Sequence, residues 1–146
     1  MRKMPTHLHG VVDYTVGAAL TMLPRMLGLR GRPAQLLEGA GAGAIAYSLL
    51  TNYEMGIVRA IPMKAHLAMD ALSGGMLLAA AAVLDDEDDD ARLVLAGVGL
   101  FEIAAALTTQ TTSATEVQPA SAQHGAQRGG EAEMVELDGA ETGVPT

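Results

Sequence analysis

Two histidine–aspartate pairs are the residues of this sequence whose types and spacing best suit chemistry. His9 and Asp13 are four positions apart, and so are His66 and Asp70. Residues at i and i+4 share one face of a helix, so each pair places an imidazole beside a carboxylate. Two imidazoles with carboxylates suit zinc-like or manganese-like divalent ions. The same groups can also relay protons, because histidine titrates near neutral pH.

A structural role competes with these interpretations. A histidine and an aspartate one turn apart can hydrogen-bond each other, or the matching pair on another helix, and so join helices within a membrane. The sequence favours this role over a ligand or proton site. Glu102 is expected to lie deeper in the protein and to add a third carboxylate. The candidate polar cluster is His9, Asp13, His66, Asp70 and Glu102.

Each pair belongs to a longer pattern, P-x3-H-x3-D-x3-G, that opens an apolar run. The four residues of the first copy recur 57 positions later in the chain. The matched positions are Pro5 and Pro62, His9 and His66, Asp13 and Asp70, and Gly17 and Gly74. A constant offset across four residue types predicts an internal duplication.

Four apolar segments must position these pairs. They span about residues 8–27, 33–53, 62–84 and 90–109. Apolar and small residues lie on all sides of each segment, whereas the helices of a soluble bundle carry a charged face. Segments of about 20 residues match the hydrocarbon thickness of a bilayer. The sequence therefore predicts an all-α fold, a bundle of four transmembrane helices.

The duplication divides the predicted bundle into two tandem two-helix repeats, about residues 5–53 and 62–109, within a membrane domain of residues 1–110. Two helices return the chain to the side on which it started, so both His/Asp pairs are expected at one depth. The ends of the second and fourth segments return to that side too. They carry Tyr47, Ser48, Thr51, Asn52, Glu54, Thr108 and Thr109.

Glycines are expected to let the helices approach closely, as small residues do in membrane bundles. The predicted packing positions are Gly17, Gly41, Gly43, Gly74, Gly97 and Gly99. A nucleotide-binding loop would need a preceding strand and a G-x-G-x-x-G pattern, and the sequence offers neither.

Composition and charge exclude some classes of protein. The net charge is −8, and most acids lie in residues 85–90 and after residue 110, so no basic face suits nucleic acid. The chain has no Cys, which excludes disulfides and thiolate metal sites. The run at 85–90 lacks the alternation and central glycine of a calcium loop. The polar composition after residue 110 predicts a disordered acidic tail over residues 111–146.

The predicted location is the cell membrane, with multiple passes. Four basic residues fall on each side, so the positive-inside rule does not choose an orientation, and we place the N-terminus inside. The basic start before an apolar run is not interpreted as a signal peptide, because the pattern recurs at residue 62.

The H-x3-D pairs, the Tyr-Ser-Leu-Leu-Thr-Asn-Tyr-Glu stretch at 47–54 and Ile61-Pro62 carry a family resemblance. Together they resemble the SPW-repeat family of small integral membrane proteins, over about residues 5–110. Of the Ser-Pro-Trp motif that names the family, the first repeat keeps Pro24 and a Leu27-Gly28 ending. The resemblance implies an integral membrane protein and supplies no known reaction.

Two functional hypotheses follow. The first is a non-enzymatic scaffold or accessory subunit that contacts the lipid bilayer and a membrane-protein partner or a second copy of itself. The second is ion- or proton-coupled transport or binding through the His/Asp residues. The sequence contains no catalytic constellation and predicts no cofactor, apart from a divalent metal under the second hypothesis.

Overall fold

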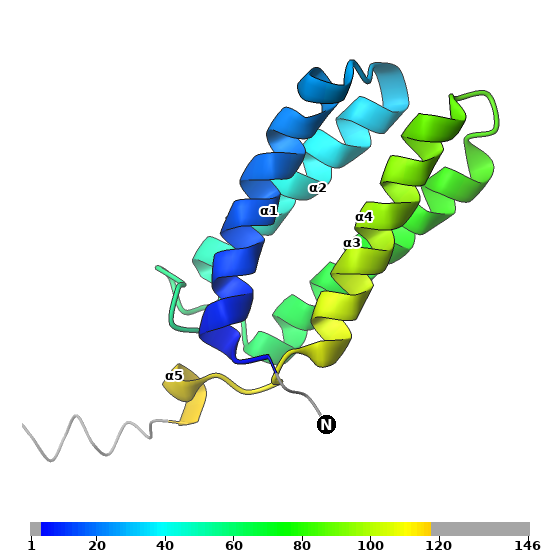
Figure 1. Cartoon of the computed structure of the whole chain (residues 1–146). Coiled ribbons are helices and arrows are strands. Elements are labelled where there is room, and N and C mark those ends of the chain that lie inside the picture. The colour runs from blue at the N-terminus through cyan, green and yellow to red at the C-terminus, as the bar shows by residue number, and fades with distance from the viewer. Residues whose placement is uncertain (1–3, 118–146) are drawn as a thin grey trace, which may run out of the picture. The chain divides into compact units, whose positions relative to one another are not determined.

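The described chain is built from two helical hairpins. The computed structural model describes residues 4–117. Its helices are α1 (Thr6–Leu27), α2 (Gly31–Leu50), α3 (Met63–Val83), α4 (Asp89–Thr108) and the single turn α5 (Ala114–Val117). α1 packs on α2 as the first hairpin, and α3 packs on α4 as the second (Figure 1). The predicted all-α class is confirmed for this part of the chain.

Proline sets the start of the first helix in each hairpin. Pro5 and Pro62 precede α1 and α3 with nearly the same backbone angles, φ −66° and ψ 152° against φ −67° and ψ 150°. The fixed φ of proline suits a helix start. The His9 N–H donates to the Pro5 carbonyl and the His66 N–H donates to the Pro62 carbonyl, both at 3.1 Å. Each histidine is thus held one turn inside a defined helix start.

The end of α2 differs from its prediction. α2 stops at Leu50 and not at residue 53, because Thr51 adopts extended backbone angles of φ −82° and ψ 141°. Thr109, after α4, is similarly extended. Isolated bridges then pair Thr51 with Ile61 and Thr109 with Met4. The residue that ends each hairpin is therefore paired with the residue that leads into the other hairpin, through hydrogen bonds made by the neighbours of the two threonines.

Within each hairpin the helices cross at a pair of glycines. A Cβ on Gly41 would lie 2.5 Å from the Gly17 carbonyl oxygen, and one on Gly99 would lie 2.5 Å from that of Gly74. These distances are shorter than van der Waals contact, so the backbones touch only because side chains are absent. Close packing is thus observed at Gly17, Gly41, Gly74 and Gly99.

Close packing within the described residues is not observed at Gly43 and Gly97, where it was also predicted. Apart from the neighbouring backbone of its own helix, no heavy atom of the described residues lies within 4 Å of a Cβ built on either residue. Each lies two positions from a glycine that does pack, which is about 200° around the helix. The two residues therefore face away from the partner helix of their own hairpin.

Two apolar clusters flank the polar region of the helical unit. The larger fills the part nearer the α1–α2 and α3–α4 turns, and its buried residues are Leu20, Leu37, Leu77, Ala81, Leu84 and Leu95. The smaller consists of Tyr53, Met63, Leu67 and Ala106. The buried histidines and aspartates are thus backed by apolar packing on both sides.

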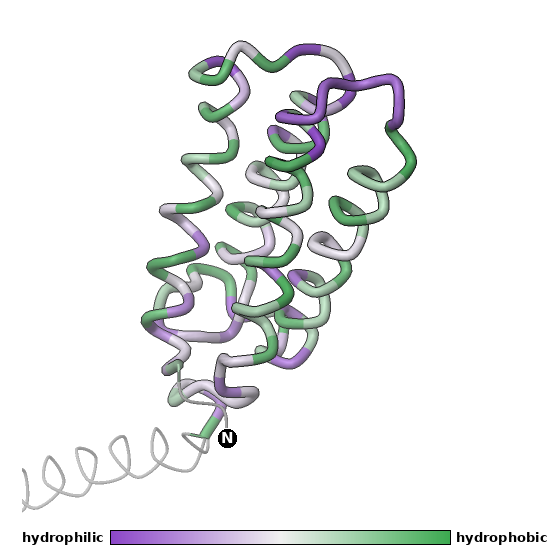
Figure 2. The backbone as a smooth tube through the Cα atoms, turned by 45° about the vertical axis from the view of Figure 1, so that its right-hand side comes forward, coloured by the Kyte–Doolittle hydropathy of each residue, from purple (hydrophilic) through white to green (hydrophobic). Residues whose placement is uncertain are grey.

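Two of the helices, α3 and α4, are long and apolar enough to cross a membrane. α1 and α2 have similar lengths, but α1 contains His9 and Asp13, and α2 contains Arg32 and Glu38. Figure 2 shows apolar residues along the helices and the longest hydrophilic stretch in the turn between α3 and α4. The structure therefore supports two candidate spans, fewer than the four that the sequence predicts.

The chain after α4 continues the helical unit for a few residues. The sequence predicts a tail from residue 111, but the unit extends through Glu116. The buried Ser113 hydroxyl donates to the Asn52 carbonyl at 2.7 Å, and the Glu116 carboxylate accepts from the Met63 N–H at 2.8 Å. These polar side chains satisfy main-chain groups, which composition alone does not reveal. The predicted tail from residue 118 lies outside the described residues.

Candidate functional site

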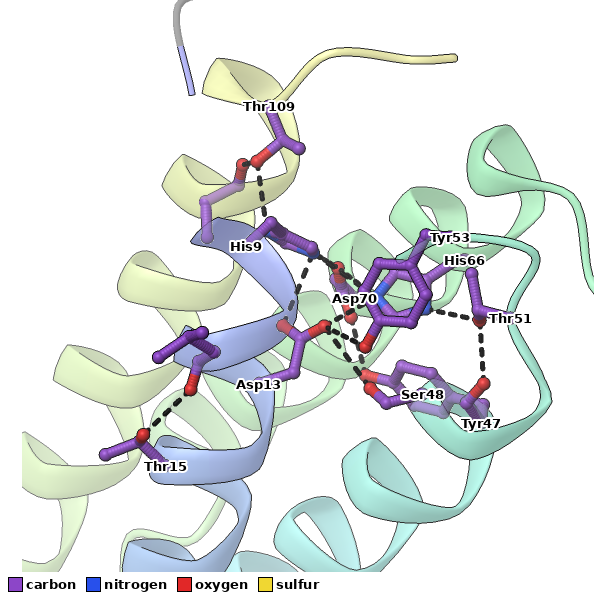
Figure 3. Close-up of polar contacts among 12 residues, drawn as sticks. His9, Asp13, Thr15, Tyr47, Ser48, Thr51, Tyr53, His66, Asp70 and Thr109 are labelled. Carbon is purple, nitrogen blue, oxygen red and sulfur yellow. Dashed lines mark hydrogen bonds and ion pairs between the residues drawn. The ribbon is translucent and has the colours of Figure 1, made fainter. Parts of the chain in front are cut away.

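Four buried side chains meet near the starts of α1 and α3. His9 and Asp13 come from α1, and His66 and Asp70 come from α3 (Figure 3). None of the four is more than 8% exposed. One potential ligand atom from each lies within 4.8 Å of the others. We call these four residues the His/Asp cluster.

The shortest contacts of the His/Asp cluster cross between the hairpins. His9 Nε2 lies 3.0 Å from Asp70 Oδ2, and His66 Nε2 lies 3.0 Å from Asp13 Oδ2. The contacts along one helix are longer, 3.3 Å within the first pair and 3.5 Å within the second. The two Nε2 atoms are 3.2 Å apart. The cluster therefore joins α1 to α3.

A threonine from the opposite hairpin contacts the outer nitrogen of each imidazole. His66 Nδ1 lies 2.8 Å from Thr51 Oγ1, and His9 Nδ1 lies 2.9 Å from Thr109 Oγ1. Each threonine hydroxyl also donates to the main-chain carbonyl four residues earlier, at 2.7 Å. A hydroxyl has only one proton, so each threonine oxygen accepts from Nδ1–H. In the neutral rings, Nε2 then presents its lone pair to the cluster.

Hydroxyl groups from α2 and the following loop hold the carboxylates. The Tyr47 hydroxyl donates to Asp70 Oδ1 at 2.6 Å, and the Ser48 hydroxyl donates to Asp13 Oδ2 at 3.2 Å. The Tyr53 hydroxyl lies 3.5 Å from the same Asp13 oxygen. Burial raises the pKa of Tyr53, so its hydroxyl keeps the proton and acts as a donor.

With neutral imidazoles, the cluster brings hydrogen-bond acceptors together with no donor between them. Two nitrogen lone pairs and two carboxylates cannot share a buried space unless positive charge lies between them. A divalent ion supplies that charge, and the two carboxylates neutralise it. Tetrahedral ligands at zinc distances of about 2.0–2.1 Å would be about 3.3 Å apart. The N–N separation of 3.2 Å and the N–O separations of 3.0–3.5 Å are close to that value. His9 contacts Oδ1 of Asp13 and His66 contacts Oδ2, and one ligand atom from each of the four residues lies within 4.8 Å of the others, so a bound ion would draw the four groups closer together.

Protons are the other source of positive charge. With a hydrogen on Nε2, each histidine would donate to the carboxylate of the opposite hairpin at 3.0 Å. Two imidazolium–carboxylate pairs would then join the hairpins, which is the structural role favoured by the sequence. The two arrangements differ in one measurable property, the binding of a metal ion.

Glu102 lies beside the His/Asp cluster and is not one of its four converging groups. It is 8% exposed and comes from α4. Together with His9, Asp13 and Asp70 it lines a cavity of about 20 Å³. The structure thus places Glu102, the fifth predicted residue, in the same polar region, where it shares this cavity with three of the other four.

The sequence placed several hydroxyl residues at this end without assigning their contacts. Thr51 and Thr109 were expected there, yet their pairing with the histidines of the opposite hairpin was not predicted. Tyr53 was not predicted to belong to the site. Its ring packs against the ring of His66, with 5.5 Å between the two centroids. One signal was available, since a threonine ends the second helix of both predicted repeats, 58 positions apart.

Comparison with known proteins adds no relative. No protein-family model, no curated protein and no solved structure matches this chain.

Proposed function

We propose that this chain is an integral membrane protein that binds one divalent transition-metal ion through the His/Asp cluster. The ligands are His9 Nε2, His66 Nε2 and one oxygen each from Asp13 and Asp70. The ion joins the two hairpins, so its proposed role is binding and assembly rather than catalysis. Zinc and manganese are the ions that this donor set suits best.

One observation carries the proposal: both histidines turn Nε2 inward, toward each other and the carboxylates, while Nδ1–H is engaged by threonine. Metal-binding histidines commonly donate the other ring N–H to a fixed acceptor, which sets the tautomer and the ring orientation. Thr51 and Thr109 do this at 2.8 and 2.9 Å. Tyr47 and Ser48 hydrogen-bond the carboxylates in the same supporting role.

Exposed apolar side chains support the membrane part of the proposal. Leu72 on α3 is 65% exposed, and Leu93 and Leu100 on α4 are 71% and 60% exposed. Further exposed apolar residues lie on α1 and α2, among them Leu8 and Leu36. Such faces are costly in water, and lipid would cover them. We therefore propose that all four long helices cross the membrane, in two duplicated hairpins.

The proposed ligands can be tested by the metal content of the protein purified in detergent. After saturation with zinc and removal of unbound ion, we expect about one zinc per chain in the wild type and its loss in His9→Ala and His66→Ala. His7→Ala is the matched control, because His7 is exposed on the same helix as His9. Circular dichroism checks that the variants keep their helices.

Wild-type protein without bound zinc or manganese would overturn this proposal and leave the two imidazolium–carboxylate pairs as the account of the cluster. The resemblance to the SPW-repeat family and the scaffold hypothesis stay predictions. Co-purification of a membrane partner tests the latter.

A further inference from the structure

Glu102 has one oxygen that the fold leaves without a partner. The residue is 8% exposed, and its Oε2 atom is buried with no hydrogen-bond partner among the described residues. A buried carboxylate oxygen without a donor is costly, so its neighbourhood is expected to supply one.

The cavity beside Glu102 has room for one water molecule. Its volume is about 20 Å³, and a site of roughly 10–15 Å³ is enough for a single water. Its polar walls are Glu102, His9, Asp13 and Asp70, and Tyr47 adds a hydroxyl. A water there would reach both the unpartnered oxygen and the cluster.

The chemistry of the walls indicates what such a water must contact. Carboxylate oxygens and imidazole lone pairs accept hydrogen bonds, so they engage the hydrogens of the water. The Tyr47 hydroxyl is already donated to Asp70 at 2.6 Å. The water oxygen therefore needs a positive partner, and an ion in the His/Asp cluster is such a partner.

We infer that the metal centre is completed by a water ligand that Glu102 holds in this cavity. The inference rests on the proposed function. The water oxygen binds the ion, and one water hydrogen is donated to Glu102 Oε2. The ion then has four protein ligands and one exchangeable position, unlike a closed structural zinc site.

Cobalt substitution tests this inference through visible absorption, because four-coordinate Co²⁺ absorbs several-fold more strongly than five-coordinate Co²⁺. We expect the wild type to bind about one Co²⁺ with a weak five-coordinate spectrum. Glu102→Leu should bind Co²⁺ with a several-fold stronger, four-coordinate spectrum. Glu102→Gln keeps an acceptor oxygen and should resemble the wild type.

Glu38→Leu is the matched control, because Glu38 is a partly exposed carboxylate on α2 that pairs only with Arg25 among the described residues, at 3.7 Å. Its cobalt spectrum should be unchanged. Stoichiometric Co²⁺ with a four-coordinate spectrum in both the wild type and Glu102→Leu would overturn the water ligand and leave the metal site standing. A wild type that binds no Co²⁺ would overturn the metal site as well.

Discussion

The position of one hydrogen on each histidine decides what the His/Asp cluster can bind. Thr51 and Thr109 fix that hydrogen on Nδ1, because their own protons are donated to main-chain carbonyls. Each threonine belongs to the hairpin opposite its histidine. Two residues that touch no ligand atom of the cluster therefore orient both imidazoles.

Replacing these threonines should weaken metal binding without removing a ligand. In Thr51→Val and Thr109→Val the imidazole loses its acceptor, and losses of about 10–100-fold in metal affinity are typical for such supporting contacts. Isothermal titration with zinc in detergent measures the affinity. Thr51→Ser keeps the hydroxyl and should bind nearly as well as the wild type.

Thr108→Val provides the control for this pair. Thr108 is exposed, and its hydroxyl donates to main-chain carbonyls of its own helix, Ala104 O at 2.7 Å and Ala105 O at 3.3 Å. Its replacement should leave the zinc affinity unchanged. Equal affinities for Thr108→Val and Thr109→Val would show that the threonine contact does not orient His9.

At the scale of the elements, the glycine crossings determine how closely the helices of a hairpin pack. Gly99→Ala places a methyl group 2.5 Å from the Gly74 carbonyl oxygen, and backbone must move to admit it. We expect it to lower the free energy of unfolding by about 1–3 kcal/mol, as overpacking does. Thermal unfolding in detergent, followed by circular dichroism, provides the measurement.

Gly97→Ala tests the same helix at an open position. A methyl group there meets nothing within 4 Å, and alanine stabilises a helix interior by roughly 0.5–1 kcal/mol relative to glycine. We therefore expect opposite signs for two substitutions two residues apart. Equal destabilisation by both would contradict the crossing at Gly74 and Gly99.

The loop between α2 and α3 is anchored by Glu54. Its carboxylate accepts from the Thr6 hydroxyl at 2.8 and 3.0 Å and from the Ala114 N–H at 3.2 Å. Desolvation by burial acts to raise the pKa of Glu54, but these hydrogen bonds outweigh it and lower the pKa below its ordinary value. The ionised carboxylate therefore stabilises the fold.

This lowered pKa gives the anchor a defined pH dependence. A carboxyl group whose folded pKa is lowered contributes stability above its unfolded value of about 4.3, and the contribution disappears as the pH falls through the folded pKa. Between about pH 5 and pH 3, wild-type stability should fall more than that of Glu54→Gln, as measured by thermal unfolding. Parallel pH profiles for the two proteins would contradict this anchor.

The sequence predicts the helices and the meeting of the two pairs, but little of what surrounds the pairs. Proline, histidine, aspartate and glycine at a fixed offset were enough to place His9 near His66. The threonine contacts could not be predicted from the sequence. They depend on extended backbone at Thr51 and Thr109 and on the pairing of these residues with Ile61 and Met4. The sequence did not distinguish Gly43 from Gly41, because small residues alone do not indicate which face of a helix meets its partner.

At the scale of the whole molecule, the segment that ends each hairpin is hydrogen-bonded to the segment that leads into the other hairpin. The Asn52 N–H donates to the Ile61 carbonyl at 2.7 Å, and the Gln110 N–H donates to the Met4 carbonyl at 3.0 Å. The His/Asp cluster repeats this pairing with side chains, since each histidine bonds the threonine of the other hairpin. Backbone and cluster thus join the hairpins at the same end of the helical unit.

Because the chain contains no cysteine, single introduced cysteines can test the proposed membrane placement. In Leu72→Cys and Leu100→Cys the thiol lies on an exposed apolar face of α3 or α4, so lipid should protect it from a water-soluble maleimide. In Asp88→Cys the thiol lies in the turn before α4. It should react with the maleimide once the reagent can reach both sides of the membrane. Equal labelling at all three positions in membranes would contradict a membrane-spanning bundle.

The central claim is that one divalent ion lies between two imidazoles and two carboxylates. X-ray absorption at the zinc edge of the zinc-loaded protein tests it most directly. We expect nitrogen and oxygen ligands at about 2.0–2.1 Å, with outer-shell scattering from two imidazole rings, and no retained zinc in the His9→Ala, His66→Ala double variant. Bound zinc without imidazole scattering in the wild type would contradict the claim.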